Sequence, residues 1–391
     1  MAQKEFSPIQ VRGLELKNRF IKTATYEGMA RNGVPDDRLF NLHASMAEND
    51  VALTIVAYGA VNEDGLTHED QMVIDESAIP HLERLADGVH EKGGKISLQL
   101  THCGYFSRST RYQSRKPLGP SRTLNKYGLM KGRPYSKAMS KDDIGSTVND
   151  FARAALISQR CGFDAVEVHM GHGYLLSQFL SPAINKRQDE YGGSLENRMR
   201  ISLEVIDAIR AEVGEDFPIF CKINMEDDFE NGFTLTDCIG AVQMLEAHGV
   251  DAVMLSGGFT SLTPFYLMRG EIPLKEMVES ETNYLQKFAL RFFGRSIIKK
   301  YDFEENFFFK QAKQVRENTK IPLVYVGGII SAEGIEKIME AGFDMIAMGR
   351  ALIAEPDFVK KIKENNKHRS PCDQCNICVG YMEKTGIRCI L

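Results

Sequence analysis

The sequence predicts a single (β/α)8 barrel, and three observations support that prediction. Short apolar runs that suit buried parallel strands alternate with longer segments of helical periodicity, and the alternation is completed eight times. The strand expected at residues 51–58 (VALTIVAY) is apolar throughout, as strands covered on both faces are. Glycine-rich turns follow the last two expected strands. A chain of 391 residues exceeds the usual size of one domain, but barrels of this class often do so.

The elements are expected in a simple order. Residues 6–18 form a β-hairpin that turns at Gly13 and closes one end of the barrel. The strands that follow are expected at residues 19–25, 51–58, 95–100, 164–168, 217–224, 251–255, 322–326 and 344–348. The helices are expected from about residues 36 and 194 onward, and at residues 78–92, 140–161, 236–248, 332–341 and 356–363. A polar loop at 101–140 and an enlarged segment at 257–318 interrupt this pattern, and the second should hold a lid or extra helices before the sixth barrel helix.

Composition narrows the functional class. The net charge of −5 gives no electrostatic basis for binding nucleic acid or an anionic membrane surface. No apolar run is long enough to span a bilayer, and the N-terminal residues lack the apolar segment of a signal peptide. We therefore expect a cytoplasmic protein that acts on a small molecule, has no nucleic-acid or membrane partner, and can form homo-oligomers.

Glycines follow the last two expected strands in positions that suit a phosphate group. Gly327 and Gly328 come after the seventh strand, and Gly349 and Arg350 come after the eighth. Barrels commonly bind phosphate with these two loops, because glycine lets the oxygens approach backbone N–H groups and arginine adds a paired charge. Either motif alone fits an ordinary turn, but both together at these barrel positions favour a phosphate site.

Three polar side chains lie where the fourth strand is expected to end. His169 and His172 form an H-x-x-H pair, and Tyr174 follows two residues later. Side chains at the carboxyl ends of barrel strands usually build the active site. A histidine pair can also ligate a metal or belong to a loop network, although no matched third ligand is evident. The residues alone leave these interpretations open.

The stretch that contains these residues resembles a known family. The run HMGHGYLLSQFLSPAINKRQDEYGGSLENRMR is similar to the Old Yellow Enzyme family of FMN-dependent oxidoreductases, and the resemblance covers nearly the whole chain. It implies FMN as the cofactor, NAD(P)H as the electron donor, and a role for the matching glycines and Arg350 in holding the FMN phosphate. The residues implied to contact the flavin ring lie at the ends of strands one to three and within strand five: Thr23, Ala24, Thr25, Ala57, Tyr58, Gln99 and Lys222.

The resemblance also gives a role to each of these side chains. Gln99 offers an amide to the pyrimidine edge of the flavin, and Lys222 offers a cation near N1 and O2. His169 and His172 would hold the carbonyl oxygen of an α,β-unsaturated substrate, and Tyr174 would protonate its α-carbon. The implied reaction is ping-pong, with hydride passing from NAD(P)H to the flavin and then from flavin N5 to the substrate β-carbon.

One position departs from the pattern of the family. Some members carry a cysteine near the end of strand one that tunes the flavin potential. The nearest position here is Tyr26, which we expect to line the substrate pocket instead.

Four of the eight cysteines lie close together near the C-terminal end. Cys372, Cys375 and Cys378 form C-x-x-C-x-x-C, and Cys389 follows. Soft ligands at this spacing favour a metal or an iron–sulfur cluster. The row is similar to that of the 2,4-dienoyl-CoA reductase branch, whose cysteines hold a 4Fe–4S cluster, although that branch usually has one more residue between its second and third cysteines. A 4Fe–4S cluster, zinc and plain reduced thiols remain open. We expect residues 1–370 to form the FMN-binding barrel and residues 371–391 to form a Cys-rich C-terminal extension.

Two other functions fit the same residues. Relatives that run the reaction in the oxidative direction, as FMN-dependent dehydrogenases or demethylases, share the flavin barrel. A flavin-free aldolase or isomerase acting on phosphorylated substrates is also compatible with the phosphate glycines, and Lys222 would then form a Schiff base. The leading hypothesis remains reduction of the C=C bond of an α,β-unsaturated carbonyl compound.

Overall fold

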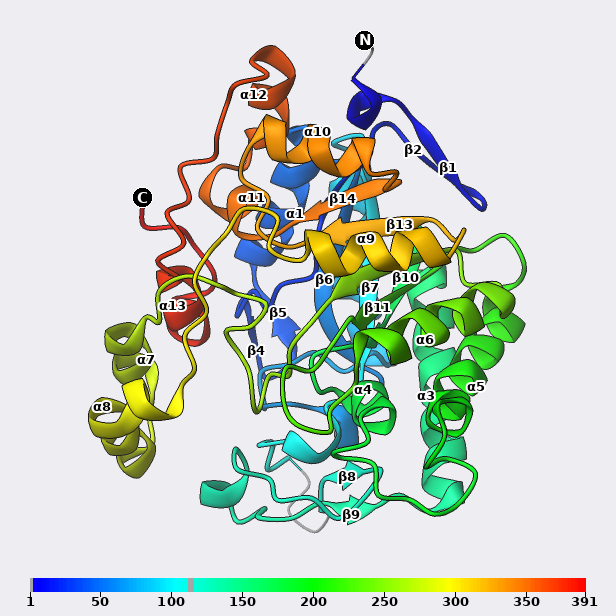
Figure 1. Cartoon of the computed structure of the whole chain (residues 1–391), viewed down its shortest axis with the longest axis vertical. Coiled ribbons are helices and arrows are strands. Elements are labelled where there is room, and N and C mark those ends of the chain that lie inside the picture. The colour runs from blue at the N-terminus through cyan, green and yellow to red at the C-terminus, as the bar shows by residue number, and fades with distance from the viewer. Residues whose placement is uncertain (1–2, 112–115) are drawn as a thin grey trace.

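The computed structural model describes residues 3–111 and 116–391 and contains the expected barrel (Figure 1). Eight parallel strands close into a ring, and each strand pairs with its neighbours in sequence order. The strands are β3 (Phe20–Lys22), β6 (Leu53–Ala60), β7 (Lys95–Thr101), β10 (Ala165–Met170), β11 (Ile219–Asn224), β12 (Ala252–Ser256), β13 (Leu323–Val326) and β14 (Met345–Met348). The predicted (β/α)8 fold is therefore confirmed. Met1 and Ala2, part of the N-terminal segment considered above, lie outside the described residues.

Helices cover the outside of this ring. They are α1 (Asp37–Glu48), α2 (Ile79–His90), α3 (Lys141–Arg160), α5 (Leu195–Val213), α6 (Leu235–Ala247), α9 (Phe309–Asn318), α10 (Ala332–Glu340), α11 (Arg350–Ala354) and α12 (Phe358–Glu364). Several begin where a short polar side chain accepts a hydrogen bond from a backbone N–H of the first turn, which satisfies donors that the helix itself leaves free. The capping residues are Asp36, Ser140, Ser194, Thr234 and Ser331.

The interior of the barrel is packed with side chains and closed at one end. The hairpin β1 (Ile9–Val11) and β2 (Leu14–Leu16) pairs antiparallel, as expected. Its buried residues Val11, Leu14 and Leu16 join one apolar cluster with inward-facing residues of the strands, including Phe220 and Met345. A hairpin that plugs this end leaves the opposite end, where the strands finish, available for a site.

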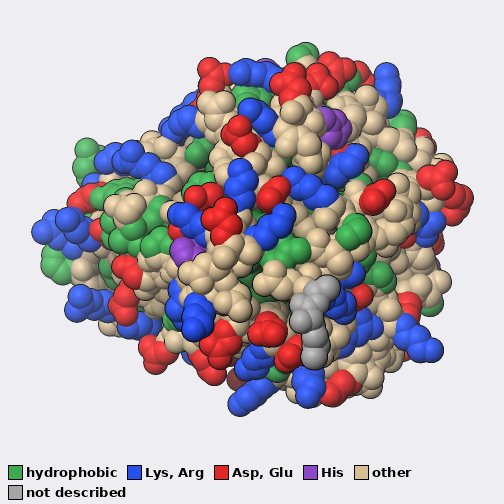
Figure 2. All heavy atoms as spheres, turned by 90° about the horizontal axis from the view of Figure 1, so that it is seen from above, with side chains coloured by type: hydrophobic (Ala, Val, Ile, Leu, Met, Phe, Trp, Pro, Cys, Tyr) green, Lys and Arg blue, Asp and Glu red, His purple; other side chains and the backbone are tan. Residues whose placement is uncertain are grey.

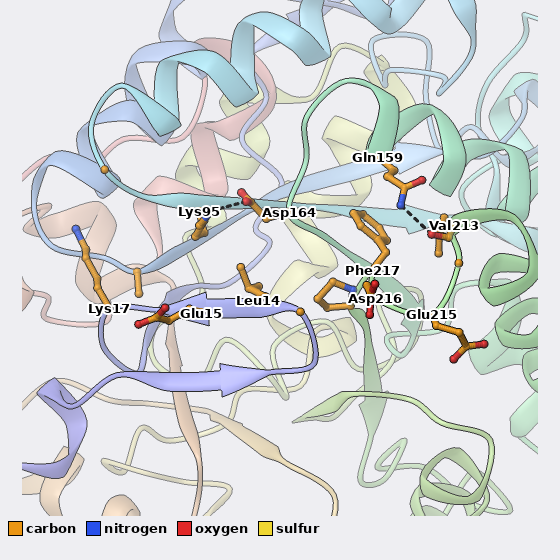
Figure 3. Close-up of a pocket in the computed structure, with 15 residues that line it drawn as sticks. Leu14, Glu15, Lys17, Lys95, Gln159, Asp164, Val213, Glu215, Asp216 and Phe217 are labelled. Atoms are coloured by element: carbon orange, nitrogen blue, oxygen red, sulfur yellow. Dashed lines mark hydrogen bonds and ion pairs between the residues drawn. The ribbon is translucent and has the colours of Figure 1, made fainter.

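A pocket of about 790 Å³ lies beside the hairpin, at the end of the barrel where the strands begin. Figure 3 shows Lys95 directed toward Asp164 and Gln159 toward the backbone of Val213. Lys95 starts β7 and Asp164 directly precedes β10, so this pocket is at the opposite end from His169 and Tyr174. It therefore has no part in the site described below.

The structure differs from the sequence expectations in the connections. No element was expected between the strand at 164–168 and the helix that begins near 194, but residues 175–180 form the short helix α4 (Leu175–Leu180), in which every residue is buried. A single apolar turn is too short to show helical periodicity, which explains the missed helix. The loop at 101–140 contains the small pair β8 (Leu118–Gly119) and β9 (Lys137–Ala138), and β4 (Ala30–Arg31) pairs with β5 (Val34–Pro35) after strand one.

The enlarged segment after β12 does hold extra helices ahead of the sixth barrel helix. They are α7 (Leu274–Ser280) and α8 (Tyr284–Ile297), and they project from the barrel at the lower left of Figure 1. The C-terminal helix α13 (Ile377–Thr385) lies against α7, where Ser280 donates a hydrogen bond to Gly380 O at 2.8 Å. No helix in the described ranges is long and apolar enough to cross a membrane.

Candidate active site

The three polar residues predicted at the end of strand four come together at the barrel mouth. His169 is the fifth residue of β10, and His172 and Tyr174 follow it before α4. The His169 ring lies 4.5 Å from the Tyr174 ring and 5.0 Å from the His172 ring, centroid to centroid. His169 and Tyr174 are almost fully buried, and His172 is half-buried. The structure thus brings the predicted catalytic residues into one cluster.

The backbone after β10 explains how this cluster forms. His172 and Gly173 both have positive φ, at 57° and 79°, so the chain reverses sharply as it leaves the strand. A Cβ on Gly173 would lie 2.4 Å from the ring of Phe259, so glycine is required there. The His172 backbone N–H donates to Asn224 Oδ1 at 2.9 Å, and its Nε2 lies 2.7 Å from Ser256 Oγ. Residues of β11 and β12 therefore fix the orientation of His172.

Both histidines are neutral around pH 7. Burial lowers the pKa of His169 well below its usual value, and electrostatic interaction with His172 and Lys222 lowers it further. Burial, with a contribution from Lys222, lowers the pKa of His172 to about 3. His169 Nδ1 is buried and has no hydrogen-bond partner among the described residues. Neutral imidazoles each offer one N–H donor, which suits a ligand oxygen that gains negative charge.

Tyr174 is held as a neutral phenol. Burial raises its pKa well above 10, and the neighbouring Tyr58 raises it further. The Tyr58 ring lies 5.4 Å from it and the Phe106 ring lies 5.1 Å from it, both edge-on. Tyr174 is protonated and lies beside aromatic rings and two neutral histidines. Its hydroxyl can therefore deliver a proton to a carbanion-like carbon, but it does not act as a base at ordinary pH.

Gln99 and Lys222, expected to meet a flavin ring, lie on strands adjacent to β10. In the strand register Gln99 pairs with Glu167, and Lys222 pairs with His169. Residues at i and i+2 of a strand share a face, so Glu167 and His169 point to the same side of β10. Glu167 Oε1 accepts from Gln99 Nε2 at 2.6 Å and forms an ion pair with Lys222 Nζ at 3.0 Å. The two predicted residues are thus joined by a carboxylate that sequence reasoning did not select.

The residues at the end of strand one lie across the barrel from Lys222 of β11. Lys222 Nζ donates to Thr23 Oγ1 at 3.0 Å. Thr25 follows two residues later, and its methyl carbon lies near Gly349, where an added Cβ would meet it at 3.3 Å. Ala24, between them, packs against the apolar cluster of the barrel interior. A flat ring at the barrel mouth would need small side chains such as these.

Strand two brings Tyr58 to the cluster through an irregularity in its pairing with β7. The pairing of β6 with β7 shifts register between Val56 and Gly59, so Ala57 and Tyr58 lie in a β-bulge. Bulges redirect side chains and are common beside active sites. Here Tyr58 faces Tyr174, and the ring of Tyr26 lies 5.7 Å from that of Tyr58. Tyr26 therefore lies next to the cluster.

The predicted phosphate residues are at the ends of β13 and β14. Gly327 and Gly328 have φ of 142° and 74°, and a Cβ on either would come within 3 Å of Phe308 or Phe307. The turn after β13 therefore requires glycine at both positions irrespective of any ligand. Arg350 Nη1 donates to Asn376 Oδ1 at 2.6 Å and to Arg269 O at 2.8 Å. One arm of its guanidinium thus anchors the C-terminal tail.

The structure does not support the predicted metal site in the tail. The four thiols, Cys372, Cys375, Cys378 and Cys389, are free and half-buried. Within the described ranges, no three His, Cys, Asp or Glu side chains are arranged to hold a metal ion. Burial raises the pKa of Cys378 to about 11, so this thiol is protonated at ordinary pH in the metal-free chain. We therefore assign no chemistry to these cysteines.

A second group of side chains, which includes Arg108, Glu383 and His68, lies near the cluster and was not predicted from the sequence. Arg108, in the long polar loop, forms an ion pair with Glu383 of α13. Its backbone N–H donates to Thr67 O at 2.9 Å, next to His68, whose ring lies 4.9 Å from that of Tyr26. The only indication of this group in the sequence was the unusual length of the loop.

Glu167 had a clearer signal in the sequence, although it was not selected. A carboxylate between apolar residues of the run DAVEV needs a buried partner.

Known proteins resemble this chain over nearly its whole length. The model of the NADH:flavin oxidoreductase / NADH oxidase family matches residues 4–260 and 275–369. A 4,4'-dithiodibutanoate disulfide reductase of Rhodococcus erythropolis is 39% identical over 389 residues, which is 99% of this chain and 94% of the relative. An NADPH dehydrogenase of Bacillus subtilis (strain 168) is 29% identical over 92% of this chain and 94% of its own length.

Solved structures share the fold. A 2-naphthoyl-CoA reductase complex superposes with a TM-score of 0.82 at 24% identity, over 98% of this chain and 56% of that one. An Old Yellow Enzyme homologue from Zymomonas mobilis superposes with a TM-score of 0.72 at 21% identity, over 95% and 96% of the two chains. At these identities the likeness supports the barrel fold alone.

Proposed function

Because the chain belongs to the NADH:flavin oxidoreductase / NADH oxidase family, we propose that it binds FMN at the barrel mouth and reduces the C=C bond of an α,β-unsaturated carbonyl compound with electrons from NAD(P)H. Membership of this family sets aside the flavin-free aldolase or isomerase. The observation that carries the proposal is the cluster of His169, His172 and Tyr174, which stands beside Lys222 and Gln99 on neighbouring strands.

The residues at the barrel mouth fit the flavin that the family name implies. Lys222 brings a buried cation and Gln99 an amide, and Glu167 fixes both. The proposed cradle is completed by Thr23, Ala24, Thr25, Ala57 and Tyr58, with Gly327, Gly328, Gly349 and Arg350 on the phosphate side. FMN, when bound, accepts a hydride from NAD(P)H and returns it to the substrate. A cation beside the ring favours the reduced form, because that form gains negative charge.

The two histidines would bind the carbonyl oxygen of the substrate. Each is neutral and can donate one N–H, and His172 is held in place by Ser256 and Asn224. Donors fixed before the reaction stabilise charge that develops on the oxygen without having to reorganise. They therefore polarise the double bond and make its β-carbon a better hydride acceptor.

Tyr174 would supply the proton. It lies beside His169, so its hydroxyl is near a substrate whose oxygen His169 holds. Its raised pKa keeps it protonated until an enolate forms, and the α-carbon then takes the proton. The product is the saturated carbonyl compound, with one hydride at the β-carbon and one proton at the α-carbon.

The test is an anaerobic reaction of the purified, FMN-loaded chain with NADH or NADPH and 2-cyclohexenone. We expect cyclohexanone and one equivalent of oxidised nicotinamide per product. The matched control is Tyr174→Phe, which should still oxidise NAD(P)H in the first half-reaction. No saturated product from several enones, combined with flavin reduction by a secondary amine, would overturn the proposal in favour of the oxidative dehydrogenase or demethylase.

One relative favours a second candidate function. The Rhodococcus erythropolis protein, 39% identical over almost the whole chain, is a disulfide reductase. Reduction of a disulfide takes two electrons and two protons and yields two thiols, so the same flavin and the same proton donor would serve. The two functions are separated by measuring thiol release from 4,4'-dithiodibutanoate beside enone saturation under identical conditions. A turnover at least tenfold faster with the disulfide would make it the preferred substrate class.

A further inference from the structure

A cationic side chain lies beside the aromatic residues of the proposed substrate site. Arg108 follows Phe106 by two residues, and the Phe106 ring lies edge-on to Tyr174 at 5.1 Å. The Arg108 backbone N–H donates to Thr67 O at 2.9 Å, which joins the long polar loop to the segment after β6. Its side chain is 29% exposed, so solvent reaches the charged group. None of the steps proposed for enone reduction uses this guanidinium.

A chain of ring contacts connects the surroundings of Arg108 to the proposed proton donor. His68, the residue after the one that Arg108 bonds to, has its ring 4.9 Å from that of Tyr26. Tyr26 lies 5.7 Å from Tyr58, and Tyr58 lies 5.4 Å from Tyr174. Burial raises the pKa of Tyr26 and of Tyr58, and the charge of Arg108 opposes that rise in both. Arg108 is therefore close to the same aromatic side chains that contact Tyr174.

Most of the hydrogen-bonding capacity of Arg108 is unused within the protein. A guanidinium has five N–H donors, and among residues 3–111 and 116–391 this side chain donates only to Glu383 of α13. The side chain of Glu383 is 44% exposed, and an ion pair this accessible to water contributes little to stability. Arg108 can therefore exchange Glu383 for another anion at little cost to the fold.

His68 supplies a second, independent indication of a ligand. The residue is 8% exposed, and its Nε2 is buried with no hydrogen-bond partner in the part of the chain that the structure describes. In native proteins such an atom usually has a water, an ion or a ligand as its partner. Burial lowers the pKa of His68 to about 4, and the charge of Arg108 contributes, so the ring is neutral near pH 7. A neutral imidazole protonated at Nε2 can donate to an anionic oxygen.

Any preference for an anion must come from these two side chains rather than from the overall charge. The chain has a net charge of −5, and Figure 2 shows basic and acidic side chains interspersed over one face of the molecule. No broad positive field therefore attracts anions. Two further carboxylates nearby have partners of their own. Asp70 pairs with Arg31 at 2.9 Å, and Glu69 accepts from Thr110 Oγ1 at 2.6 Å.

We propose that Arg108 and His68 form a carboxylate-binding subsite beside the proposed active site, and that the preferred substrates are unsaturated carbonyl compounds carrying a carboxylate. The guanidinium can bind a carboxylate through two parallel N–H donors, and the imidazole can add a third. The substrate carboxylate would displace Glu383 from Arg108. Tyr26 and Tyr58 would contact the apolar part of the substrate between its two polar ends. The inference rests on the proposed function, whose histidines bind the other end of the same molecule.

The position of Arg108 also disfavours one substrate class. A protonated amine, the substrate of the oxidative alternative, would be repelled by a cation beside the aromatic residues. The phosphates of NAD(P)H are the other anions that approach the barrel mouth. A substrate carboxylate is favoured over them because Arg108 lies close to Tyr58, which contacts the proposed proton donor directly.

The test is the binding of two phenols that differ only in charge to the FMN-loaded full chain at pH 7, followed by charge-transfer absorbance. They are 4-(4-hydroxyphenyl)butanoate and its methyl ester, in which the alkyl chain insulates the phenol from the carboxyl group. We expect the wild type to prefer the carboxylate. Arg108→Gln should reduce that preference roughly tenfold. Glu383→Gln removes the competing anion and should increase the preference about two- to fivefold.

The matched control is Arg84→Gln. Arg84 forms an exposed ion pair with Asp37 at 2.7 Å, away from the barrel mouth, so this variant removes the same charge without touching the subsite. It should leave the preference unchanged. Glu383→Gln lies on another element and has an effect of opposite sign, so it tests the inference even if Arg108→Gln folds poorly.

Turnover provides a second readout. With (E)-7-oxooct-5-enoate and its methyl ester, Arg108→Gln should raise the KM of the carboxylate relative to that of the ester roughly tenfold. The effect should fall on KM rather than kcat, because the subsite holds the substrate equally before and during the reaction.

Three outcomes would contradict the inference in different ways. Equal preference in the wild type and in Arg108→Gln would overturn it while leaving enone reduction intact. Slower flavin reduction by NAD(P)H in Arg108→Gln, with an unchanged phenol preference, would assign the cation to the dinucleotide phosphates instead. Failure of both phenols to bind the wild type would refute the proposed function, and this inference with it.

Discussion

Replacing Glu167 by glutamine should destabilise the fold far more than the same change at a surface ion pair. The Glu167 carboxylate lies 3.0 Å from Lys222 Nζ, and both side chains are at most 2% exposed. A second buried pair, Lys22 with Glu27, lies close enough to influence the Lys222 pKa, so two cations and two carboxylates balance inside the barrel. Glutamine keeps the shape and one acceptor oxygen but leaves this group with a net positive charge.

The expected loss follows from the distance and the burial. Two unit charges 3.0 Å apart interact with about 5 kcal/mol at an effective dielectric constant near 20. Removing one partner of a buried pair typically costs about 3–5 kcal/mol, because the remaining charge is uncompensated. Burial already lowers the pKa of Lys222, and the loss of Glu167 would lower it further. Since the glutamine oxygen still accepts one hydrogen bond, we expect a loss of about 3 kcal/mol.

The assay is urea unfolding of the FMN-saturated protein, followed by circular dichroism. Glu48→Gln is the matched control, because Glu48 lies 3.1 Å from Lys92 but the two side chains are 57% and 44% exposed. We expect that control to lose less than about 1 kcal/mol. Glu167→Gln/Lys222→Met should lose less than Glu167→Gln alone, since it removes both charges. Equal small losses at Glu167 and Glu48 would refute the view that the buried pair is charged and desolvated.

Three further predictions concern the barrel mouth. Tyr174→Phe should lower enone turnover by about 10²- to 10⁴-fold while stopped-flow reduction of the flavin by NAD(P)H stays near wild type; an equal fall in both half-reactions would indicate a structural role. His169→Ala and His172→Ala should each weaken phenol binding, read from charge-transfer absorbance, by about tenfold, and unchanged absorbance titrations would contradict the assignment. Burial lowers the pKa of His102 to about 4, below the value near 6.5 of an unfolded chain, so the unfolded state takes the extra proton first and stability falls as the pH drops below 6.5. His102→Gln should therefore remove about 2 kcal/mol of the stability lost between pH 7 and pH 5, and an unchanged slope of urea midpoint against pH would exclude this origin.

The cluster that we propose as catalytic was predictable because its members are close in sequence. His169, His172 and Tyr174 lie within six residues, and one sharp turn at Gly173 is enough to bring them together. Lys222 and Gln99 were also placed correctly at the ends of strands, but their mutual contact through Glu167 depends on the register of three strands. No local pattern encodes that register.

In the C-terminal region, by contrast, the sequence pattern was a poor guide to how the side chains are arranged. The spacing of its cysteines suggested a ligand set, but spacing does not determine whether four side chains converge, and in the described residues they do not form a metal site. Likewise, the position of Arg350 after strand eight did not indicate that its guanidinium also bonds to Asn376 of the tail. Where a long side chain points depends on what packs beside it.

The sequence by itself determined the barrel, the order of its strands and the residues at its mouth. It did so because hydrophobic periodicity, helix caps and glycine turns act over a few residues and leave local traces. Only the tertiary structure decided the partners of Glu167, the bulge that turns Tyr58 toward Tyr174, and the ion pair between Arg108 and α13. These features join segments that are far apart in the chain, and their energies depend on burial and geometry that exist only after the barrel has closed.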